Sequence, residues 1–314
     1  MTTPSKSRWS AAVKVIVTVF FLAVALYLVD LDVLGDRLRH AAFGPLAVAG
    51  LIFALSGFAG AASWLCVLRT RLPEMSYREA AACHWSGMFF NSFLPTNVGG
   101  DVVKGYLLAH AHGQVGFVVT SLLLDRTVNL LILVEIGLFA FLIHLGKTAW
   151  ALGLLVLIAL LFLACSACAR RLAEWTHRWP REGLCGRAAS LLEPVFELLS
   201  QRRAFAKMLA AAGLSQTLKT WQNVFLIQAL ALDIPAACVW YVIPLFGIVS
   251  ALPISIGGLG VREVLAHHLA TPLGTDNTHL VAFSLASQFI VTAVDMFGIL
   301  PFVFARRKAA RENV

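Results

Sequence analysis

Long apolar runs separated by short polar stretches dominate this chain. Each of the longest runs reaches the roughly 20 residues that a helix needs to cross about 30 Å of hydrocarbon. These runs cover residues 10–30, 45–68, 114–144, 149–168, 207–232 and 278–304. The pattern therefore predicts an all-α polytopic membrane protein with about six full transmembrane helices.

Two further apolar segments carry a repeated motif that breaks helices. Residues 93–104 and 251–262 lie 158 positions apart, and seven of their twelve positions are identical or near-identical. Both copies contain Leu-Pro followed by paired glycines. Apolar segments interrupted by Gly and Pro at corresponding places in two halves of a membrane protein point to a transporter's binding site. We therefore expect two broken helices that face each other at the centre of the membrane.

The distribution of Lys and Arg predicts how the chain is oriented. Cytoplasmic loops carry an excess of these residues, and here they collect in four clusters, Lys6 to Lys14, Arg69 to Arg78, Arg170 to Lys207 and Arg306 to Arg311. We expect a multi-pass protein of the cell (inner) membrane with both termini in the cytoplasm. Segments 80–113 and 236–277 must then be re-entrant hairpins that enter the membrane from opposite sides.

This topology predicts an inverted repeat within a single membrane domain, residues 1–314. The first repeat unit is 45–144 and the second is 207–304, an arrangement typical of alternating-access transporters. A basic cytoplasmic loop, 169–206, joins them. Apolar residues at 191–199 have the spacing of an amphipathic helix on the membrane surface. A simple linker between the halves is the alternative.

Composition and charge narrow the function classes. Hydrophobic residues make up 59% of the chain, charged residues 13%, and the mean hydropathy is +0.79, which excludes an ordinary soluble domain. The net charge of +8 lies in flanks and loops of the apolar runs, so we expect no nucleic-acid partner. Cys165 and Cys168 have the spacing of a metal or redox pair but no second pair, which favours helix packing. The sequence has no phosphate-loop, zinc-protease or hydrolase motif, so we expect no metal and no cofactor.

Charged residues follow both breaks. A helix that restarts after Gly-Gly exposes free N–H groups and about half a positive charge, which favours phosphate. Lys104 and Arg262 lie one turn inside these half-helices and are the expected anion contacts. The alternative for each charged residue is an ion pair with a neighbouring helix, for which Asp125, Arg126 and Asp295 are candidate partners.

Uncharged polar residues surround the same breaks. They either contact a ligand or cap the broken helices. His84, His267 and His268 could relay protons, and buried structural histidines are the alternative. The predicted substrate-binding residues are Asn91, Pro95, Asn97, Gly99, Gly100, Asp101, Lys104, Asp125, Arg126, Pro253, Ser255, Gly257, Gly258, Gly260, Arg262 and Glu263.

Three sequence motifs, at 94–101, 124–126 and 252–263, resemble the lysylphosphatidylglycerol synthase transmembrane, or flippase-like, family. The resemblance spans roughly residues 10 to 305. It implies an integral membrane protein associated with translocation of polar lipids, sometimes fused to a cytoplasmic aminoacyl-phospholipid synthase domain. Few residues follow the last predicted span, so we expect no lysyl transfer from tRNA.

Two functions are consistent with these features. The first is a lipid flippase or transporter that moves a polar or anionic lipid, phospho- or polyprenyl-linked, across the cytoplasmic membrane. The alternative is a membrane enzyme or accessory subunit that acts on a lipid-linked intermediate of a glycolipid or hopanoid pathway, with Asp101, Asp125 or Glu263 as acid or base. The expected partners are membrane lipids with anionic headgroups and lipid-modifying enzymes. The sequence does not choose among the lipid cargoes.

Overall fold

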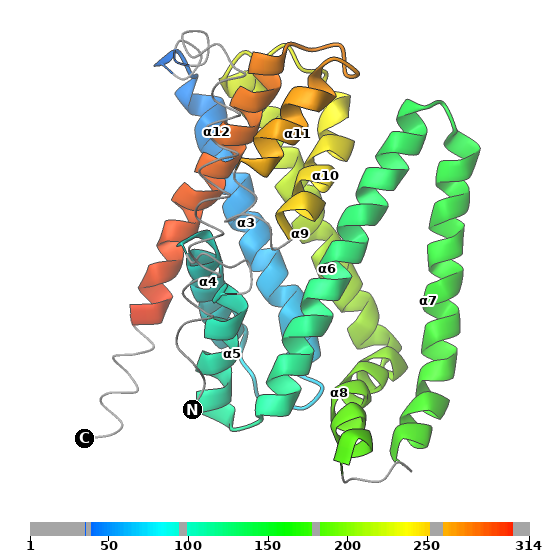
Figure 1. Cartoon of the computed structure of the whole chain (residues 1–314). Coiled ribbons are helices and arrows are strands. Elements are labelled where there is room, and N and C mark those ends of the chain that lie inside the picture. The colour runs from blue at the N-terminus through cyan, green and yellow to red at the C-terminus, as the bar shows by residue number, and fades with distance from the viewer. Residues whose placement is uncertain (1–34, 36–38, 94–98, 178–182, 252–259, 304–314) are drawn as a thin grey trace. The chain divides into compact units, whose positions relative to one another are not determined.

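The computed structural model describes residues 35, 39–93, 99–177, 183–251 and 260–303, which fold as helices joined by short turns. This confirms the predicted all-α fold class. The elements are α3 Phe43–Leu68, α4 Tyr77–Phe93, α5 Gly99–His112, α6 Val115–His144, α7 Thr148–His177, α8 Gly183–Ser200, α9 Arg202–Ala229, η1 Ala236–Cys238, α10 Val239–Ala251, α11 Val261–Ala270, α12 Asn277–Asp295 and η3 Met296–Gly298 (Figure 1).

Four helical stretches in the described part of the chain are long and apolar enough to cross a membrane. They are α3, α6, the first part of α7, and α12 with its continuation to Val303. Four of the predicted spans are thus confirmed by length and composition. The run 207–232 forms α9, which has 28 residues but carries buried polar side chains and is not among the four. The run 10–30 lies outside the described residues.

Each copy of the repeated motif separates two helices. α4 ends at Phe93 and α5 begins at Gly99; α10 ends at Ala251 and α11 begins at Val261. The helices on either side agree with the predicted broken-helix pattern, because Pro and paired Gly disfavour a continuous helix. The Leu-Pro steps themselves lie outside the described residues. Insertion of the two segments from opposite sides of the membrane stays a prediction.

The predicted cytoplasmic loop 169–206 is largely helical. α7 continues into it as far as His177, and α8 contains the helix expected at 191–199. α8 packs against α6 and α7 (Figure 1). Leu198 is fully buried in a cluster with side chains of α3, α6 and α9, so α8 is part of the folded core.

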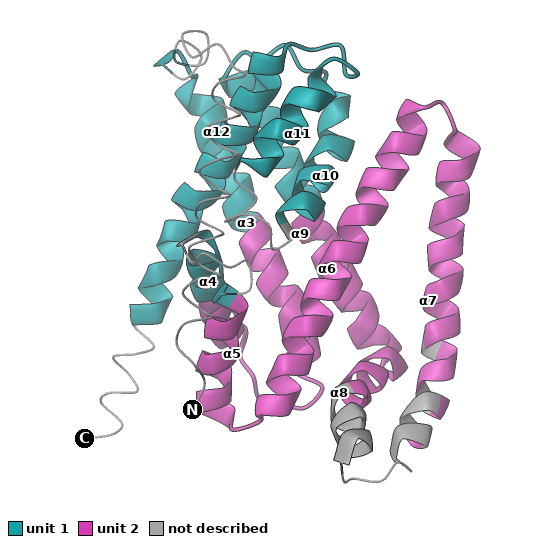
Figure 2. Cartoon of the chain, viewed as in Figure 1, with its two compact units in different colours: residues 1–55, 85–100, 217–314 teal, residues 56–84, 101–216 magenta. Residues whose placement is uncertain are grey.

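The chain forms two compact units (Figure 2). Unit 1 contains residues 1–55, 85–100 and 217–314, and unit 2 contains 56–84 and 101–216. Helices α3, α4, α5 and α9 contribute residues to both units. The units therefore do not follow the boundaries of the predicted sequence repeats.

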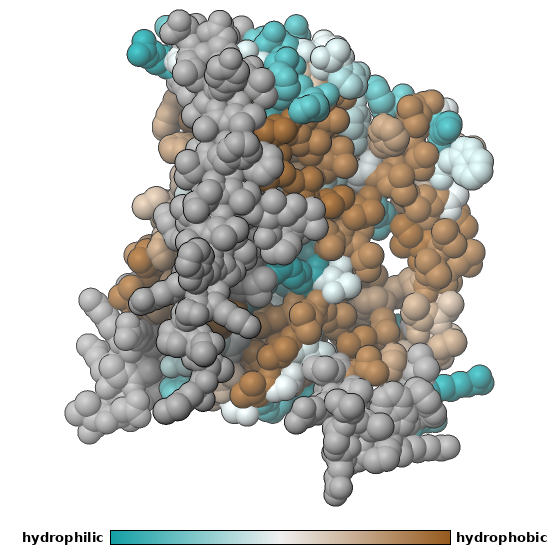
Figure 3. Space-filling model, in the orientation of Figure 1, coloured by the Kyte–Doolittle hydropathy of each residue, from teal (hydrophilic) through white to brown (hydrophobic). Residues whose placement is uncertain are grey.

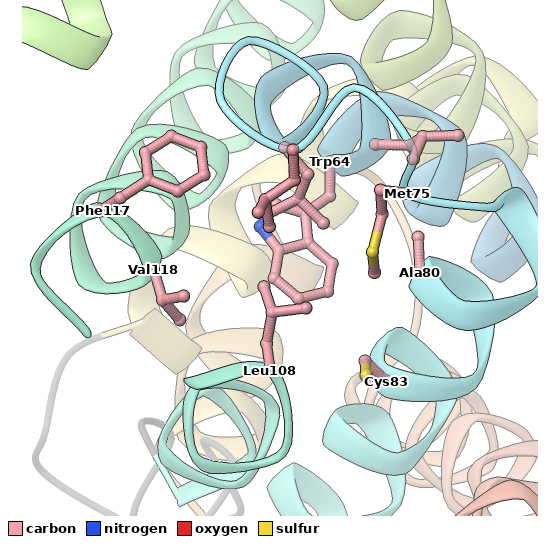
Figure 4. Close-up of a cluster of buried hydrophobic side chains, with 10 residues drawn as sticks. Trp64, Met75, Ala80, Cys83, Leu108, Phe117 and Val118 are labelled. Atoms are coloured by element: carbon pink, nitrogen blue, oxygen red, sulfur yellow. The ribbon is translucent and has the colours of Figure 1, made fainter. Parts of the chain in front are cut away.

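Trp64 is at the centre of the core of unit 2. Its side chain is fully buried among residues from α3, the turn after α3, α4, α5 and α6, including Met75, Leu108 and Phe117 (Figure 4). The indole Nε1 donates a hydrogen bond to Ser121 Oγ at 3.2 Å, so burial leaves its polar atom satisfied. This cluster fixes α5 against α3 and α6.

Apolar side chains cover the outside of α6 and α7. Figure 3 shows them as a band along both helices, with hydrophilic side chains near its ends. Only 6% of the apolar window of α7 is buried inside the molecule. An apolar surface of this extent suits contact with lipid. Exposed members on α7 are Trp150, Leu152, Leu155, Val156, Leu157, Leu160, Leu161 and Leu163.

Unit 1 contains the second pair of helices around a break. α11 packs against α12 and α10, and the rings of Phe246 on α10 and Phe283 on α12 are both buried, with centroids 6.5 Å apart. This packing places the beginning of α11 against the middle of α12. It sets the surroundings of Arg262.

Candidate functional site

Lys104 and Asp125 are the buried members of an ion-pair cluster in unit 2. Lys104 Nζ lies 3.7 Å from Asp101 Oδ1 and 3.8 Å from Asp125 Oδ2. The same ammonium group lies 4.6 Å from the centre of the Trp64 ring, where a cation–π contact is favourable. Two carboxylates and an aromatic face thus compensate the charge of Lys104. This is the ion-pair arrangement that the sequence left open, with Asp125 as the predicted partner.

Neutral side chains and Arg126 extend this cluster. Arg126 Nη1 donates to Asp101 Oδ2 at 3.1 Å. Asn129 Nδ2 donates to Asp125 Oδ1 at 3.1 Å, and Gln216 Nε2 donates to Asn129 Oδ1 at 2.9 Å. The two aspartates balance Lys104 and Arg126, so the formal charges of the four residues cancel. We refer to Asp101, Lys104, Asp125 and Arg126 as the Lys104 cluster.

At the first break, Asn91 at the end of α4 caps the beginning of α5. Gly100 donates its backbone N–H to Asn91 Oδ1 at 2.8 Å, which satisfies an N–H group at the beginning of α5. Of the two predicted roles for the polar residues near the breaks, Asn91 therefore has that of a helix cap. A Cβ atom at Gly100 would lie 1.9 Å from the carbonyl oxygen of Gly87, so only glycine fits.

Asp295, a predicted ion-pair partner, instead contacts a hydroxyl group: Ser92 Oγ donates to Asp295 Oδ2 at 2.5 Å.

Arg262 is a buried cation whose direct contacts are neutral, although the charge of the adjacent Glu263 also acts on it. Its side chain is in unit 1, and only 7% of the residue is exposed. Nη1 donates to Gln288 Oε1 at 2.7 Å, and the guanidinium carbon lies 5.1 Å from the centre of the Phe246 ring. Its Nε atom is buried without a hydrogen-bond partner. Within the described part of the chain, no carboxylate forms an ion pair with Arg262. We refer to Arg262, Gln288 and Phe246 as the Arg262 site.

The neighbouring Glu263 closes the amino end of α11. It is fully buried; Oε2 accepts the backbone N–H of Gly260 at 2.6 Å, and Oε1 accepts the hydroxyl of Ser284 at 2.8 Å. Gly260 has a φ of 82°, in the left-handed region that favours glycine. The last glycine of the second motif thus allows the turn into α11, and Glu263 caps it.

The two cations therefore have different electrostatic surroundings. A buried charge without a partner costs several kcal/mol, and arginine cannot avoid this cost by losing its proton. In the Lys104 cluster, Asp101 and Asp125 supply the negative charges that compensate the buried cation within unit 2. The Arg262 site lacks an anion in contact with the guanidinium group, and its free Nε is a donor available to one.

Several predicted site residues cannot be placed, and the structure adds others. Pro95, Asn97, Pro253, Ser255, Gly257 and Gly258 lie outside the described residues. His267 has a buried Nδ1 without a partner, whereas His268 Nδ1 contacts the carbonyl of Val264 at 2.8 Å. Gln288 and Ser284 were not predicted as site residues. Their only signal in the sequence is a polar side chain inside an apolar run.

The comparisons with known proteins agree with the resemblance of the motifs. The family model described as the Lysylphosphatidylglycerol synthase TM region matches residues 11–297. This match includes both breaks and the Lys104 cluster. The search of curated proteins and the search of solved structures find no match. The chain therefore belongs to the Lysylphosphatidylglycerol synthase TM region family, whose members are multi-pass membrane proteins related to lipid metabolism or transport.

Proposed function

We propose that this protein is a lipid flippase or transporter that moves a polar or anionic lipid across the cytoplasmic membrane. The observation that carries the proposal is the Arg262 site, a buried guanidinium group directly after a helix break, with no carboxylate in ion-pair contact among the described residues and with a buried Nε donor that lacks a hydrogen-bond partner. A permanently charged group in such a place needs an anion. A lipid headgroup that carries phosphate provides one.

Phosphate matches the chemistry of the Arg262 site. Guanidinium groups bind phosphate oxygens through two parallel N–H donors, and such charge-assisted hydrogen bonds are stronger than neutral ones. Gln288 holds one edge of the guanidinium group through Nη1, while Nε has no partner. Binding would cancel the charge of Arg262 and of the headgroup together. It would therefore lower the cost of holding both at membrane depth.

The breaks give the transport proposal a structural basis. In transporters with inverted repeats, substrate sites lie near the membrane midplane, where broken helices from both halves meet. The two broken helices of this chain, together with their predicted insertion from opposite sides, agree with such an arrangement. Contacts of the cargo with the other predicted residues, including Lys104, Asp101 and Glu263, stay predictions from the sequence that this proposal does not use. In this proposal the Lys104 cluster stabilises the fold, and Arg262 contacts the cargo.

The enzyme alternative receives less support from the same side chains. Asp101 and Asp125 each contact a cation, and both oxygens of Glu263 accept hydrogen bonds. A general acid or base must exchange a proton with a substrate. Carboxylates engaged in this way are better explained as structural groups.

Lipid exchange in liposomes tests the proposal. Purified protein would be reconstituted with labelled phosphatidylglycerol, phosphatidic acid, a polyprenyl phosphate or phosphatidylcholine, and transfer between leaflets would be measured against protein-free liposomes. We expect transfer of at least one phosphate-bearing lipid. Absence of transfer across the whole panel would refute the proposal. Covalent change of the lipid, detected by mass spectrometry, would support the enzyme alternative.

A further inference from the structure

Unit 2 contains a basic hollow where the carboxyl end of α3 meets the junction of α8 and α9. Its volume is about 590 Å³, within the range of small-molecule sites. Four of its eight lining residues are basic and none is acidic. We refer to it as the basic hollow. The basic residues are Arg69, Arg202, Arg203 and Lys207, and Cys66 forms part of the wall.

The positive charges of the basic hollow come from two distant parts of the sequence. Arg69 follows α3, whereas Arg202, Arg203 and Lys207 belong to α9. Lys207 and Arg69 are close enough for their charges to act on the thiol of Cys66. None of the three α9 cations forms an ion pair with a described residue. Membrane orientation requires only that such residues occur in cytoplasmic loops; it does not require that they surround one hollow.

The beginning of α9 adds a second source of positive potential. Arg202 and Arg203 are the first two residues of this helix, and the first intrahelical bond from this end joins the N–H of Phe205 to the carbonyl of Gln201. The N–H groups before Phe205 lack intrahelical acceptors, and the helix dipole is positive at this end. Natural helices favour Asp or Glu here, but the first turn of α9 has no acidic residue. Two arginines at this position favour an external anion.

We propose that the basic hollow binds the phosphate-bearing headgroup of a membrane lipid at the cytoplasmic edge of α3 and α9. Arginine side chains and free helix N–H groups are both strong phosphate ligands, and basic pockets at the ends of transmembrane helices bind anionic headgroups. The residues differ from those of the Arg262 site. This inference therefore does not rest on the proposed transport function, and either can fail without the other.

Alkylation of the native Cys66 provides the test. The full-length protein would be placed in nanodiscs of phosphatidylcholine alone, of phosphatidylcholine with phosphatidic acid, or of phosphatidylcholine with inorganic phosphate in the buffer. The rate of reaction of Cys66 with uncharged N-ethylmaleimide would be followed by mass spectrometry, with Cys66 in detergent-denatured protein as the reference for full access. If phosphatidic acid fills nine-tenths of the sites, the rate at Cys66 should fall about tenfold.

Paired variants separate specific binding from a general effect of surface charge. Arg202→Gln/Arg203→Gln should abolish the protection by phosphatidic acid, and Lys207→Gln should weaken it if the double variant does not fold. The control Arg78→Gln/Arg171→Gln removes the same charge from exposed positions outside the hollow and should keep the protection. Equal rates in all nanodiscs, or protection that persists in the hollow variants, would overturn the proposal. Protection by inorganic phosphate alone would overturn the assignment to a lipid.

Discussion

Lys104 and Arg262 occupy corresponding positions of the repeated motif but have different partners. The first copy of the motif places Asp101 three residues before its cation, where the second copy has Leu259. Asp125 on α6 adds a further negative charge near Lys104, while neutral Gln288 contacts Arg262. The same substitution should therefore have different effects at the two positions.

Replacement of Lys104 by Gln should destabilise the protein. It leaves Asp125 buried without its cation, and breaking a buried pair costs about 3–5 kcal/mol. We expect a low yield of monodisperse protein after detergent extraction. The double variant Lys104→Gln/Asp125→Asn removes the stranded charge and should recover the yield. Normal yield of the single variant would show that the Lys104 cluster contributes little to stability.

Replacement of Arg262 by Gln should instead remove function. Among the described residues Arg262 forms no ion pair, so its removal leaves no carboxylate without its cation. The neutral amide of Gln keeps the capacity for hydrogen bonding. We expect near-normal yield and monodispersity, with lipid transfer in liposomes reduced to the level of protein-free controls. Arg171→Gln removes an exposed charge and should keep transfer. Aggregation of Arg262→Gln would indicate a structural role and contradict the headgroup contact.

At the scale of elements, a single arginine ties the loop after α3 to α8. Arg71 donates from Nε and Nη2 to the two carboxylate oxygens of Glu197, both at 3.0 Å, and Nη2 also lies 3.4 Å from Glu193. The hydrogen bond with Glu197 is the largest cause of a raised pKa of Arg71, and it outweighs the opposing effect of burial. Bidentate pairs of this kind fix direction as well as distance. They add a directional link to the packing of α8 against α6 and α7.

The close approach of α5 to α4 predicts a strong effect of one methyl group. Gly100→Ala would place Cβ 1.9 Å from the carbonyl oxygen of Gly87, and such overpacking costs about 1–3 kcal/mol. We expect a lower midpoint of thermal unfolding in detergent. Gly153→Ala in exposed α7, where a Cβ meets nothing within 4 Å, is the matched control and should be neutral or stabilising. Equal midpoints for the two variants would contradict the packing of α5.

The amino end of α12 depends on the cap by Asp276. Its carboxylate accepts the N–H of Thr278 at 2.7 Å. Partial burial raises the pKa of Asp276, but hydrogen bonds from Thr278 and the nearby His279 outweigh it, so the net shift is downward. A lowered pKa in the folded state means that the cap stabilises α12 above the unfolded pKa of about 3.9. This stabilisation is lost as the pH falls through the pKa that Asp276 has in the folded protein.

Substitutions at Asp276 separate the cap from its charge. Asp276→Ala should cost about 0.5–2 kcal/mol and speed hydrogen exchange in the first turn of α12 at neutral pH. Asp276→Asn keeps a capping oxygen and should exchange nearly as slowly as the wild type. It should also lose the extra weakening of the cap below about pH 4, because the amide does not titrate. Unchanged exchange in Asp276→Ala would show that the cap is dispensable.

At the scale of the whole molecule, the predicted topology has a direct test. On a background without native cysteines, Glu174→Cys at the end of α7 should be cytoplasmic, and Thr271→Cys after α11 should face outside. An impermeant maleimide added to intact cells should label position 271 only, and both positions after permeabilisation. Labelling of 174 but not 271 in intact cells would invert the orientation. Labelling of both positions, or of neither, in intact cells would place them on the same side and would remove the basis for insertion of the two breaks from opposite sides.

The sequence predicts the helices better than their contacts. Helix positions follow from apolar length and from Pro and Gly, because backbone groups in lipid must be satisfied within each segment. The pairing of Lys104 with Asp125 was one of two alternatives for a buried charge. Contacts with Gln288 and Trp64 could not be predicted, since they depend on how helices rotate and pack. The boundaries of the compact units follow these contacts and therefore differ from the repeats.

The polar side chains of α9 have a consequence for biogenesis. Insertion into the bilayer during synthesis depends on the apolarity of each segment, and α9 is less apolar than its neighbours. Two of its buried polar residues donate hydrogen bonds to other helices. Ser215 donates to the backbone carbonyl of Ser56 on α3, and Gln216 donates to Asn129 Oδ1 on α6. Both of these helices leave the ribosome before α9 does. We therefore expect α9 to enter the membrane poorly by itself and to settle against helices that are already in place.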